Sequence, residues 1–528
     1  MLDQASTQLL VLARRQIASG KLGDARRTSD ALLATNGDAA IAHLQRSRLE
    51  SLDDNYRQAR MHALAAYRLG PVGKEQHVHL LTRLKIFHLV DEMRALIERM
   101  PEAMRTEPDV AAHVAFLFRA IGQPELALEH TERAVALHPD DPALLTASGV
   151  TLINLGHFAR ARERLLDCVR IAPGHAAAWW QLSRLPAQPE AGAWIDRIRA
   201  ALARSRDNKD SGLLAYALHR LLDQAGDHGE AAKALGTACF SMRRHVKYSA
   251  EDTLALFAAL RGLDFGAFPA GVADAAFTPV FIVGMHRSGT TLLEQMLSGH
   301  DEVMAAGELY NFTHQLRYAA DHHCVGELDL QVVRASPGFD YAEIGQGYLD
   351  SLEARRDGRR FVTDKLPSNF LNLGFILRAL PNAKILHMVR DPMETCFSNL
   401  REPFSETTCR YSYDQLELAQ YFREYEALML HWQDRFPGRI LHVHYSQLAG
   451  TPLDEMDRIV QFLGLDLRQA MLEPQRAGRT VSTASAVQVR SAPALPRSPK
   501  WFAYRDHLAP LVRALSPAGH KIGTPRTP

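Results

Sequence analysis

The segment Pro279–Leu297 restricts the fold of this chain more than any other part of the sequence. Its apolar run Val280–Val283 predicts a buried strand, Gly284–Gly289 predicts a tight turn, and a helix is expected to begin near Thr290. Glycines let the backbone curl, so that successive N–H groups and the start of the helix point at one anion. The segment therefore predicts an α/β fold with a phosphate-binding loop.

This loop departs from the triphosphatase pattern G-x-x-x-x-G-K-[ST] at one position. Gly284, Gly289 and Thr291 match the pattern, but Thr290 stands where it has lysine. A triphosphatase uses that lysine on the β- and γ-phosphates, so the loop argues against ATP or GTP hydrolysis. A 5′-phosphosulfate group needs no metal between two phosphates, and it suits the loop residues Arg287, Ser288, Gly289, Thr290 and Thr291. The alternative is an ordinary glycine-containing turn between a strand and a helix.

The run Met285–Thr291 resembles the 5′-phosphosulfate loop of sulfotransferases that use 3′-phosphoadenosine 5′-phosphosulfate (PAPS). The resemblance implies that PAPS is the sulfuryl donor and that no metal takes part. It also implies a catalytic role for Arg287, which would hold charge around the sulfuryl group. Further motifs, in the order that the family has them, extend the resemblance over residues 275–505.

Two of these motifs would supply catalytic side chains. Ala306–Leu309 resembles the Gly-Glu motif of tyrosylprotein sulfotransferases, which implies that Glu308 is the catalytic base. The chemistry needs a base, because an acceptor hydroxyl becomes nucleophilic as its proton is withdrawn. Phe361–Phe370 is similar to the family's Asp-Lys-x-Pro segment, which implies that Lys365 stabilises charge on the leaving phosphate. The alternatives are a solvated loop carboxylate and a surface Asp-Lys pair.

Two other motifs would bind the rest of the nucleotide. In sulfotransferases the Val-Arg-Asp-Pro…Ser pattern, which Lys384–Ser398 resembles, binds the 3′-phosphate, and this implies that role for Arg390 and Ser398. The planar fork of an arginine suits a phosphate because it can bind two oxygens. Ile440–Leu448 resembles the family's strand that ends in a tyrosine near the nucleotide, which implies that Tyr445 contacts the adenosine. The alternative is a buried tyrosine at the end of a strand.

The last motif, Val481–Arg490, looks like the Thr-Ala-Ser-x-x-Gln-Val-Arg segment of bacterial sulfotransferases that follow tetratricopeptide repeats. In eukaryotic tyrosylprotein enzymes this region supplies a transition-state serine and a basic phosphate ligand. The resemblance therefore implies that Ser485 is catalytic and that Arg490 binds the donor. Ser482 and Thr483 remain alternatives for the serine, and a Ser/Ala-rich loop is the alternative for the whole segment.

The N-terminal half repeats itself with a period of 34 residues. The matching pairs are Gly122 and Gly156, Ala127 and Ala161, and Pro139 and Pro173. This period is that of the tetratricopeptide repeat, in which two helices pair and stack on the next unit. We expect the glycines and alanines where paired helices touch, and each proline at the end of a second helix. Weaker copies occur at 19–25, 52–59 and 225–231, whereas 72–106 and 180–210 are degenerate; the alternative is an ordinary helical bundle.

The pattern changes from about Phe277 onwards. Apolar runs that predict strands alternate there with amphipathic helices, at Val280–Val283, Arg360–Val362, Lys384–Val389 and Arg439–Val443. Such alternation is typical of a parallel sheet with crossover helices. We expect residues 1–265 to form an all-α tetratricopeptide-repeat solenoid and residues 275–520 an α/β, P-loop-like sulfotransferase domain with a parallel sheet. The linker between them is predicted at Leu263–Gly271.

Length, charge and composition bear on the number of domains, on nucleic-acid binding and on the cellular location of the protein. A length of 528 residues predicts two or more domains, and a net charge of +1 gives no overall signature of nucleic-acid binding. We find no apolar run long enough to span a membrane and no signal peptide, and the five cysteines are scattered. These features predict a cytoplasmic protein with reduced thiols. His442 and His444 have no companion ligand motif, so we interpret them as structural.

The sequence thus predicts transfer of a sulfuryl group from PAPS to an acceptor hydroxyl. A protein tyrosine, a saccharide and a small phenol are open alternatives for the acceptor. Repeats commonly bind peptides on concave surfaces, which favours a peptide or protein acceptor and a protein partner on the repeats. After Glu308 the chain lacks the arginine that follows in eukaryotic tyrosylprotein enzymes, which argues against tyrosine-peptide specificity. The rival hypothesis is a repeat-based interaction protein whose nucleotide-binding domain is not catalytic.

Overall fold

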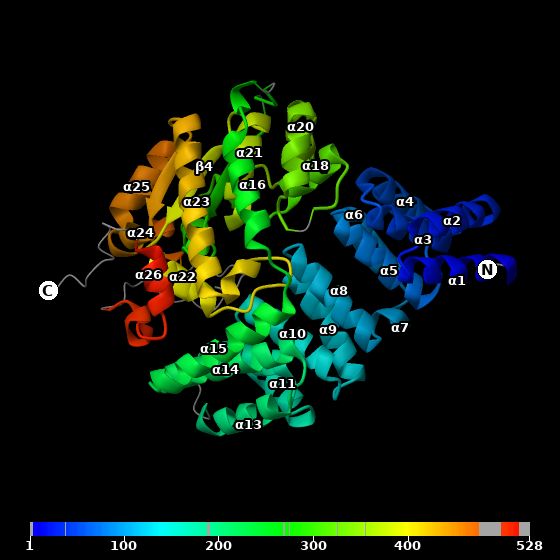
Figure 1. The fold of residues 1–528 in the computed structure, drawn as a ribbon, viewed down its shortest axis with the longest axis horizontal. Helices are drawn as coiled ribbons and strands as arrows, with labels where there is room; N and C mark the ends of the chain where they lie inside the picture. The colour runs from blue at the N-terminus through cyan, green and yellow to red at the C-terminus, as the bar shows by residue number, and fades with distance from the viewer. Residues whose placement is uncertain are drawn as a thin grey trace.

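The computed structural model describes residues 4–36, 39–186, 191–267, 270–273, 275–324, 326–353, 355–474 and 498–516. Its N-terminal part is helical and forms a curved array that wraps around one side of the sheet-containing part (Figure 1). The helices of the array are α1 (Gln4–Ala18), α2 (Leu22–Asn36), α3 (Ala40–Leu52), α4 (Tyr56–Leu69), α5 (Gly73–Ile86), α6 (Val90–Arg99), α7 (Glu102–Arg105), α8 (Pro108–Ala120), α9 (Pro124–Leu137), α10 (Pro142–Leu155), α11 (Phe158–Ile171), α12 (Ala176–Arg184), α13 (Ala191–Arg204), α14 (Asn208–Gln224), α15 (His228–His245) and α16 (Ala250–Gly262).

The turn inside each helix pair recurs at the predicted interval of 34 residues. The residues with positive φ at these turns are Gly20, Asp54, His88, Gly122 and Gly156. Five residues after each turn stands a buried side chain, and these are Ala25, Ala59, Met93, Ala127 and Ala161. The all-α repeat architecture is therefore confirmed, and it includes the region 72–106, whose sequence is degenerate.

Our expectation for the two glycines was wrong, whereas that for the two alanines was right. Gly122 and Gly156 lie in the turns, with φ of 75° and 85°, and not where the helices touch. Glycine suits these positions because it adopts the left-handed conformation without strain. Ala127 and Ala161 are fully buried between helices, and a larger side chain would separate them.

The C-terminal part contains a parallel sheet of five strands in the order β2-β3-β1-β4-β5. The strands are β1 (Thr278–Gly284), β2 (Val303–Ala305), β3 (Phe361–Asp364), β4 (Lys384–Val389) and β5 (Ile440–His444). Four of them match the predicted runs. Only β2 was missed, because three residues are too few to show a period. In such a sheet the carboxyl ends of the strands meet at one edge, where ligands bind.

Helices cover both faces of this sheet (Figure 1). They are α17 (Thr290–Leu297), α18 (Asn311–Ala320), α19 (Leu330–Ala335), α20 (Tyr341–Glu353), α21 (Leu373–Ala379), α22 (Pro392–Leu400), α23 (Gln415–Arg435), α24 (Tyr445–Gly450), α25 (Pro452–Leu463) and α26 (Ala509–Leu515). One face packs against the apolar side chains of α17 and α25, and the other belongs to a larger core that includes α21 and α23. The predicted α/β class with a parallel sheet is confirmed.

One residue of the segment that we predicted as a linker is packed into the core, whereas Asp264 and Gly266 beside it are exposed. Phe265, in a short 3-10 helix (Phe265–Ala267), is 2% exposed and packs edge-on against Phe375 and Trp432. The preceding helix α16 contacts α23 and α19. Helix α16 and Phe265 therefore join the core of the sheet-containing part.

Candidate functional site

The loop after β1 has the backbone of an anion-binding turn. Gly284, Arg287 and Gly289 have positive φ of 152°, 70° and 111°, and α17 begins directly afterwards at Thr290. A Cβ atom on Gly284 would lie 2.7 Å from the carbonyl oxygen of Met388, so only glycine fits there without a shift. Loops with such positive φ values can turn backbone N–H groups towards an anion, although the N–H of Ser288 donates to the carbonyl oxygen of Met285 at 3.1 Å.

Three of the residues that the sequence predicts to bind PAPS come together beside this loop. The Nε of Arg287 donates to Ser398 Oγ at 3.2 Å, and Nη1 of Arg390 donates to the carbonyl oxygen of Arg287 at 3.1 Å. Arg390 is also held by Glu394, one turn into α22, at 3.0 Å. Two guanidinium groups and a hydroxyl thus converge from β1, β4 and α22.

Tyr445 closes the same side of the site. Its ring lies against Gly289, where a Cβ atom would be 2.6 Å from Tyr445 Cδ2. The guanidinium group of Arg390 lies over this ring, 4.6 Å from its centroid, which is the geometry of a cation–π contact. Tyr445 is only partly buried, so the alternative of a tyrosine enclosed at the end of the strand is wrong.

Two of the four predicted catalytic side chains, Glu308 and Lys365, form an ion pair. Lys365 Nζ donates to Glu308 Oε1 at 2.7 Å, and the side chain of Lys365 is 1% exposed whereas that of Glu308 is 34% exposed. Asp364 is fully buried next to Lys365, so the alternative of a surface Asp-Lys pair is wrong. The pair presents a carboxylate that solvent can reach and a buried ammonium group.

Glu294 of α17 supports this pair, and sequence analysis missed it. One of its carboxyl oxygens accepts hydrogen bonds from the N–H of Gly307 at 3.0 Å and from Thr363 Oγ1 at 2.8 Å. These bonds tie the residue before Glu308 to the strand that precedes Lys365. Burial raises the pKa of Glu294, and Lys365 opposes this shift. An acidic residue in an apolar helix facing the core was the signal that could have revealed it.

The helical array adds positive charge near the loop. Burial lowers the pKa of Arg287, Glu402 opposes this shift, and Arg184 of α12 lowers the pKa further. Arg220 of α14 also interacts electrostatically with Arg287. Burial lowers the pKa of Arg220 to about 10, and the positive charge of Arg287 makes a small further contribution in the same direction. Anions are drawn to such a concentration of positive charge. Sequence analysis could not assign these two arginines, because they belong to the repeats.

The remaining predictions concern the segment that contains Ser485 and Arg490, the histidines of β5, and metal binding. Ser485 and Arg490, with the alternatives Ser482 and Thr483, lie outside the described residues. His442 is held by His387 and by Gln433, each at 2.7 Å, as expected of a structural residue. Among the described residues, no three His, Cys, Asp or Glu side chains are grouped so that they could hold a metal ion.

The described residues fit an anionic nucleotide. Ser288, in the middle of the loop, is 1% exposed, and its Oγ has no hydrogen-bond partner within the described part of the chain. A buried hydroxyl without a partner costs free energy that a ligand oxygen would recover. Thr290 and Thr291 are also buried at the start of α17. The loop therefore offers hydroxyls, amides and a guanidinium group to one anion.

Comparison with known proteins agrees with this arrangement. The sulfotransferase family model matches residues 279–469, which contain the loop, the Glu308–Lys365 pair and Arg390. A tetratricopeptide-repeat model matches residues 119–185. The sheet-containing part is therefore similar to sulfotransferases, and part of the helical array is similar to tetratricopeptide repeats.

Similarity between this chain and individual relatives is distant. An uncharacterized protein of Aquifex aeolicus (strain VF5) is 26% identical over 391 residues, which are 71% of this chain and 50% of the relative. The chain thus spans about half the length of that relative. The protein-tyrosine sulfotransferase of Drosophila melanogaster is 26% identical over 37% of this chain and 39% of its own.

Among solved structures, the sulfotransferase domain of the Synechococcus PCC 7002 olefin synthase is similar over 46% of this chain and 98% of its own. Its sequence identity is 19% and its TM-score 0.31. In the described part of the chain, no helix has the length and apolar character that a membrane span requires.

Proposed function

We propose that this protein transfers a sulfuryl group from PAPS to the hydroxyl of an acceptor, with a peptide or protein as the favoured acceptor class. The observation that carries the proposal is that the polar side chains form two distinct groups. Arg287, Arg390 and Ser398 make one centre, suited to phosphate groups, and the Glu308–Lys365 pair makes the other. PAPS carries a 3′-phosphate and a 5′-phosphosulfate on one ribose, which suits the first centre, and the carboxylate of the second centre could act on the acceptor hydroxyl.

The roles follow from the chemistry of each side chain. Loop amides, Ser288 and Arg287 would hold the 5′ end of PAPS, Arg390 with Ser398 its 3′-phosphate, and Tyr445 its adenosine. When bound, PAPS would supply a sulfuryl group whose S–O bond to the 5′-phosphate breaks as the acceptor oxygen bonds to sulfur.

Glu308 would take the proton of the acceptor hydroxyl, since its carboxylate is partly exposed. Lys365 would stabilise negative charge nearby, because a buried ammonium group acts strongly where water is excluded. The roles of Ser485 and Arg490 remain part of this proposal on sequence grounds.

Ligand-induced stabilisation tests the donor. A ligand that binds only the folded state stabilises it by about 2.7 kcal/mol at 100 times its dissociation constant. We expect 3′,5′-ADP to raise the melting temperature more than 5′-AMP or ATP does. Arg390→Ala should remove most of this preference, whereas Arg133→Ala, on the exposed face of α9, should keep it. Equal shifts from all three nucleotides would refute the assignment.

Transfer of label from PAPS to tyrosine peptides, phenols and sugars tests turnover. We expect at least one class of acceptor to become labelled. Binding of 3′,5′-ADP without transfer to any acceptor would instead favour the rival hypothesis of a non-catalytic nucleotide-binding protein.

A further inference from the structure

Helix α14 of the array is attached directly to the end of α22, the helix that carries Ser398. Arg401, the residue after α22, donates from its Nε to His219 Nε2 at 2.9 Å and forms an ion pair with Asp223. His219 and Asp223 both belong to α14. This attachment places Arg220, the residue after His219, beside the last turn of α22.

Arg220 belongs to a cluster of positive charge at this junction. Burial lowers the pKa of Arg220 to about 10, and Glu402 opposes this shift. The positive charges of Arg184, Arg401 and Arg287 lower it further. Glu402 also opposes the shift that burial causes in Arg287, so two guanidinium groups share this carboxylate. An anionic ligand group between them would relieve their mutual repulsion.

The side chain of Arg220 is oriented for a ligand. Its Nε atom is enclosed and has no hydrogen-bond partner within the described residues. Its guanidinium group lies 5.9 Å from the centroid of the Trp180 ring. A cation–π contact holds the group in place without using its N–H donors. The planar fork of a guanidinium group can donate to two oxygens of one phosphate.

The repeat itself does not require an arginine at this position. Arg220 stands six residues before the turn residue Gly226, and Val150 and Phe116 stand six residues before the corresponding turns of two earlier units. Phe116 is 45% exposed, so a side chain at this position is not needed to fill the space between helices. Arg184 is 34 residues after Val150 and occupies the same position in the unit before Arg220. These two arginines are therefore available to a ligand.

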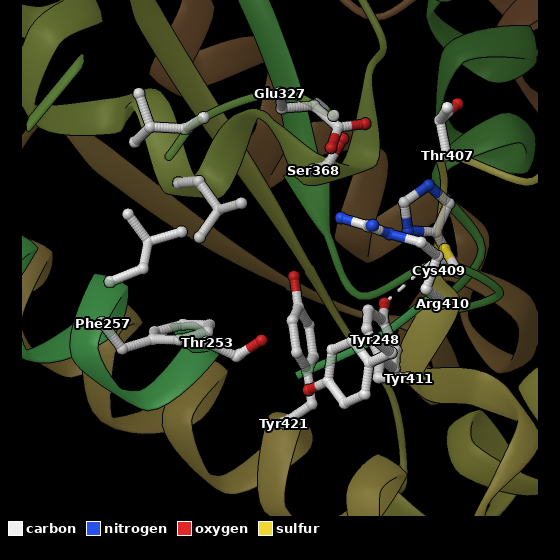
Figure 2. A pocket seen from close by; sticks show the side chains of 15 residues that line it. Tyr248, Thr253, Phe257, Glu327, Ser368, Thr407, Cys409, Arg410, Tyr411 and Tyr421 are labelled. Carbon is white, nitrogen blue, oxygen red and sulfur yellow. Dashed lines mark hydrogen bonds between the residues drawn. The ribbon is translucent and has the colours of Figure 1, made fainter. Parts of the chain in front are cut away.

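The two neighbouring loop residues His286 and Arg287 have different surroundings. His286 lines a cavity of about 90 Å³ whose wall includes Tyr421 (Figure 2). Arg220 does not line that cavity. Arg287 donates instead to Ser398 Oγ, at 3.2 Å. The arginines of the array therefore approach the loop from the side of Ser398.

We propose that Arg220, with Arg184 beside it, binds the 3′-phosphate of the donor nucleotide from the helical array. The inference rests on the function proposed above, which assigns this phosphate to Arg390 and Ser398 and gives the array no part in donor binding. It makes the donor site a shared site, so that the repeats take part in nucleotide selection.

The variant Arg220→Met tests this assignment, because it keeps a long side chain against Trp180 and removes the charge and the N–H donors. Calorimetry with 3′,5′-ADP and with 5′-AMP isolates the contribution of the 3′-phosphate. We expect the dissociation constant of 3′,5′-ADP to rise at least tenfold and that of 5′-AMP to stay within twofold of the parent. Arg220→Lys keeps the charge and loses the planar fork, so its constant for 3′,5′-ADP should lie between those of the parent and Arg220→Met.

A matched control and a stability measurement exclude indirect effects. Arg199→Met removes an arginine of α13 whose side chain is 47% exposed, and it should leave both dissociation constants unchanged. Because neighbouring guanidinium groups repel Arg220, Arg220→Met without ligand should melt at or above the temperature of the parent. A lower melting temperature together with weaker binding would identify Arg220 as a structural residue and overturn the proposal.

The pattern of nucleotide affinities decides the remaining outcomes. Unchanged discrimination between 3′,5′-ADP and 5′-AMP in Arg220→Met would overturn the proposal. An equal loss of affinity for both nucleotides would place Arg220 at the 5′ end, which also contradicts it. A parent protein that binds 3′,5′-ADP no better than 5′-AMP would refute the donor assignment itself, so the two failures are distinguishable.

Discussion

At the scale of single residues, the Glu308–Lys365 pair is notable for its unequal exposure. Lys365 is enclosed while Glu308 is partly open, although the two groups are 2.7 Å apart. Burying one charge is costly unless it is paired, so the ion pair with Glu308 offsets part of the cost of enclosing the Lys365 side chain. The same geometry leaves the carboxylate free to face a second molecule.

The first prediction concerns this carboxylate. Glu308→Gln keeps the shape of the side chain and removes the base, so the transfer rate should fall by roughly 10²–10⁴. The affinity for 3′,5′-ADP should stay close to that of the parent. Labelled PAPS with a working acceptor measures the rate, and Glu302→Gln, whose carboxylate is exposed, is the control. A variant as fast as the parent would exclude Glu308 as the base and direct attention to His286, His314 or another carboxylate.

The second prediction concerns Gly289. Gly289→Ala would place a Cβ atom 2.6 Å from the Tyr445 ring, and this ring must then move away from Arg390. We expect at least a tenfold loss of affinity for 3′,5′-ADP in calorimetry. Gly358→Ala is the matched control, because Gly358 also has positive φ, at 88°, but open space around it. It should cost only the backbone strain, about 1–2 kcal/mol of stability. Unchanged affinity in Gly289→Ala would mean that Tyr445 does not contact the nucleotide.

At the scale of elements, each of five helix pairs in the array has the same two local features. A residue with positive φ ends the first helix of a pair, and a small or flexible side chain five residues later lets the second helix approach. Asp54 and His88 take the place of glycine in two of these turns, with φ of 64° and 53°. Because these two repeats lack the glycine, they are harder to recognise in the sequence, although the turn keeps its positive φ.

The third prediction tests this packing. Ala161 is fully buried between helices, so Ala161→Leu should overfill the contact and lower the free energy of unfolding by about 1–3 kcal/mol. Ala136→Leu, on an exposed position of α9, adds the same group where it has room. Urea denaturation of both variants measures the difference. Equal stabilities would show that the helices can move apart at no cost.

At the scale of the whole molecule, the helical array contacts the sheet-containing part at both of its ends. At the C-terminal end of the array, Arg243 of α15 forms an ion pair with Glu417 of α23 at 2.8 Å. At the far end, Tyr56 of α4 hydrogen-bonds His314 of α18 at 3.0 Å, and His88 stacks on the same ring. Because α18 begins three residues after Glu308, this second contact is connected to the site through a short segment of chain.

The fourth prediction concerns acid stability. Burial lowers the pKa of His88 to about 4, below the ordinary value of 6.5, and Arg355 adds to the shift. The unfolded chain therefore binds more protons between pH 6.5 and 4, and stability contributed by the neutral ring is lost as pH falls through this range.

Buried His314 acts in the same direction, since burial places its pKa well below the ordinary value. His322 acts in the opposite direction: although burial alone lowers its pKa, hydrogen bonds with Asp329 and Asp54 raise it overall.

His88→Asn tolerates the positive φ and removes one of these groups. Between pH 7 and 5 the parent should lose stability, and the variant should lose about 1–2 kcal/mol less. His138→Asn, at an exposed position, should match the parent. Melting curves across this range measure the effect. Identical pH dependence in all three proteins would show that His88 is not held neutral by the fold.

The sequence by itself determined the features that local patterns encode. The strand–loop–helix at Gly284–Gly289, four of the five strands and the 34-residue period follow from glycine conformation and from the spacing of apolar residues. It also singled out Arg287, Arg390 and Ser398, which the fold brings together. The roles assigned to these residues, and to Ser485 and Arg490, stay predictions.

The tertiary structure alone decided which distant residues meet. The strand order β2-β3-β1-β4-β5 brings Tyr445 against Gly289 and the Gly307–Glu308 segment against Lys365. The same packing sets Phe257 of α16 against Tyr421 of α23. No local pattern contains these contacts, because each one depends on how separate elements pair and pack across the core. The physical reason is that side-chain periodicity fixes which face of an element is buried, but not which other element covers that face.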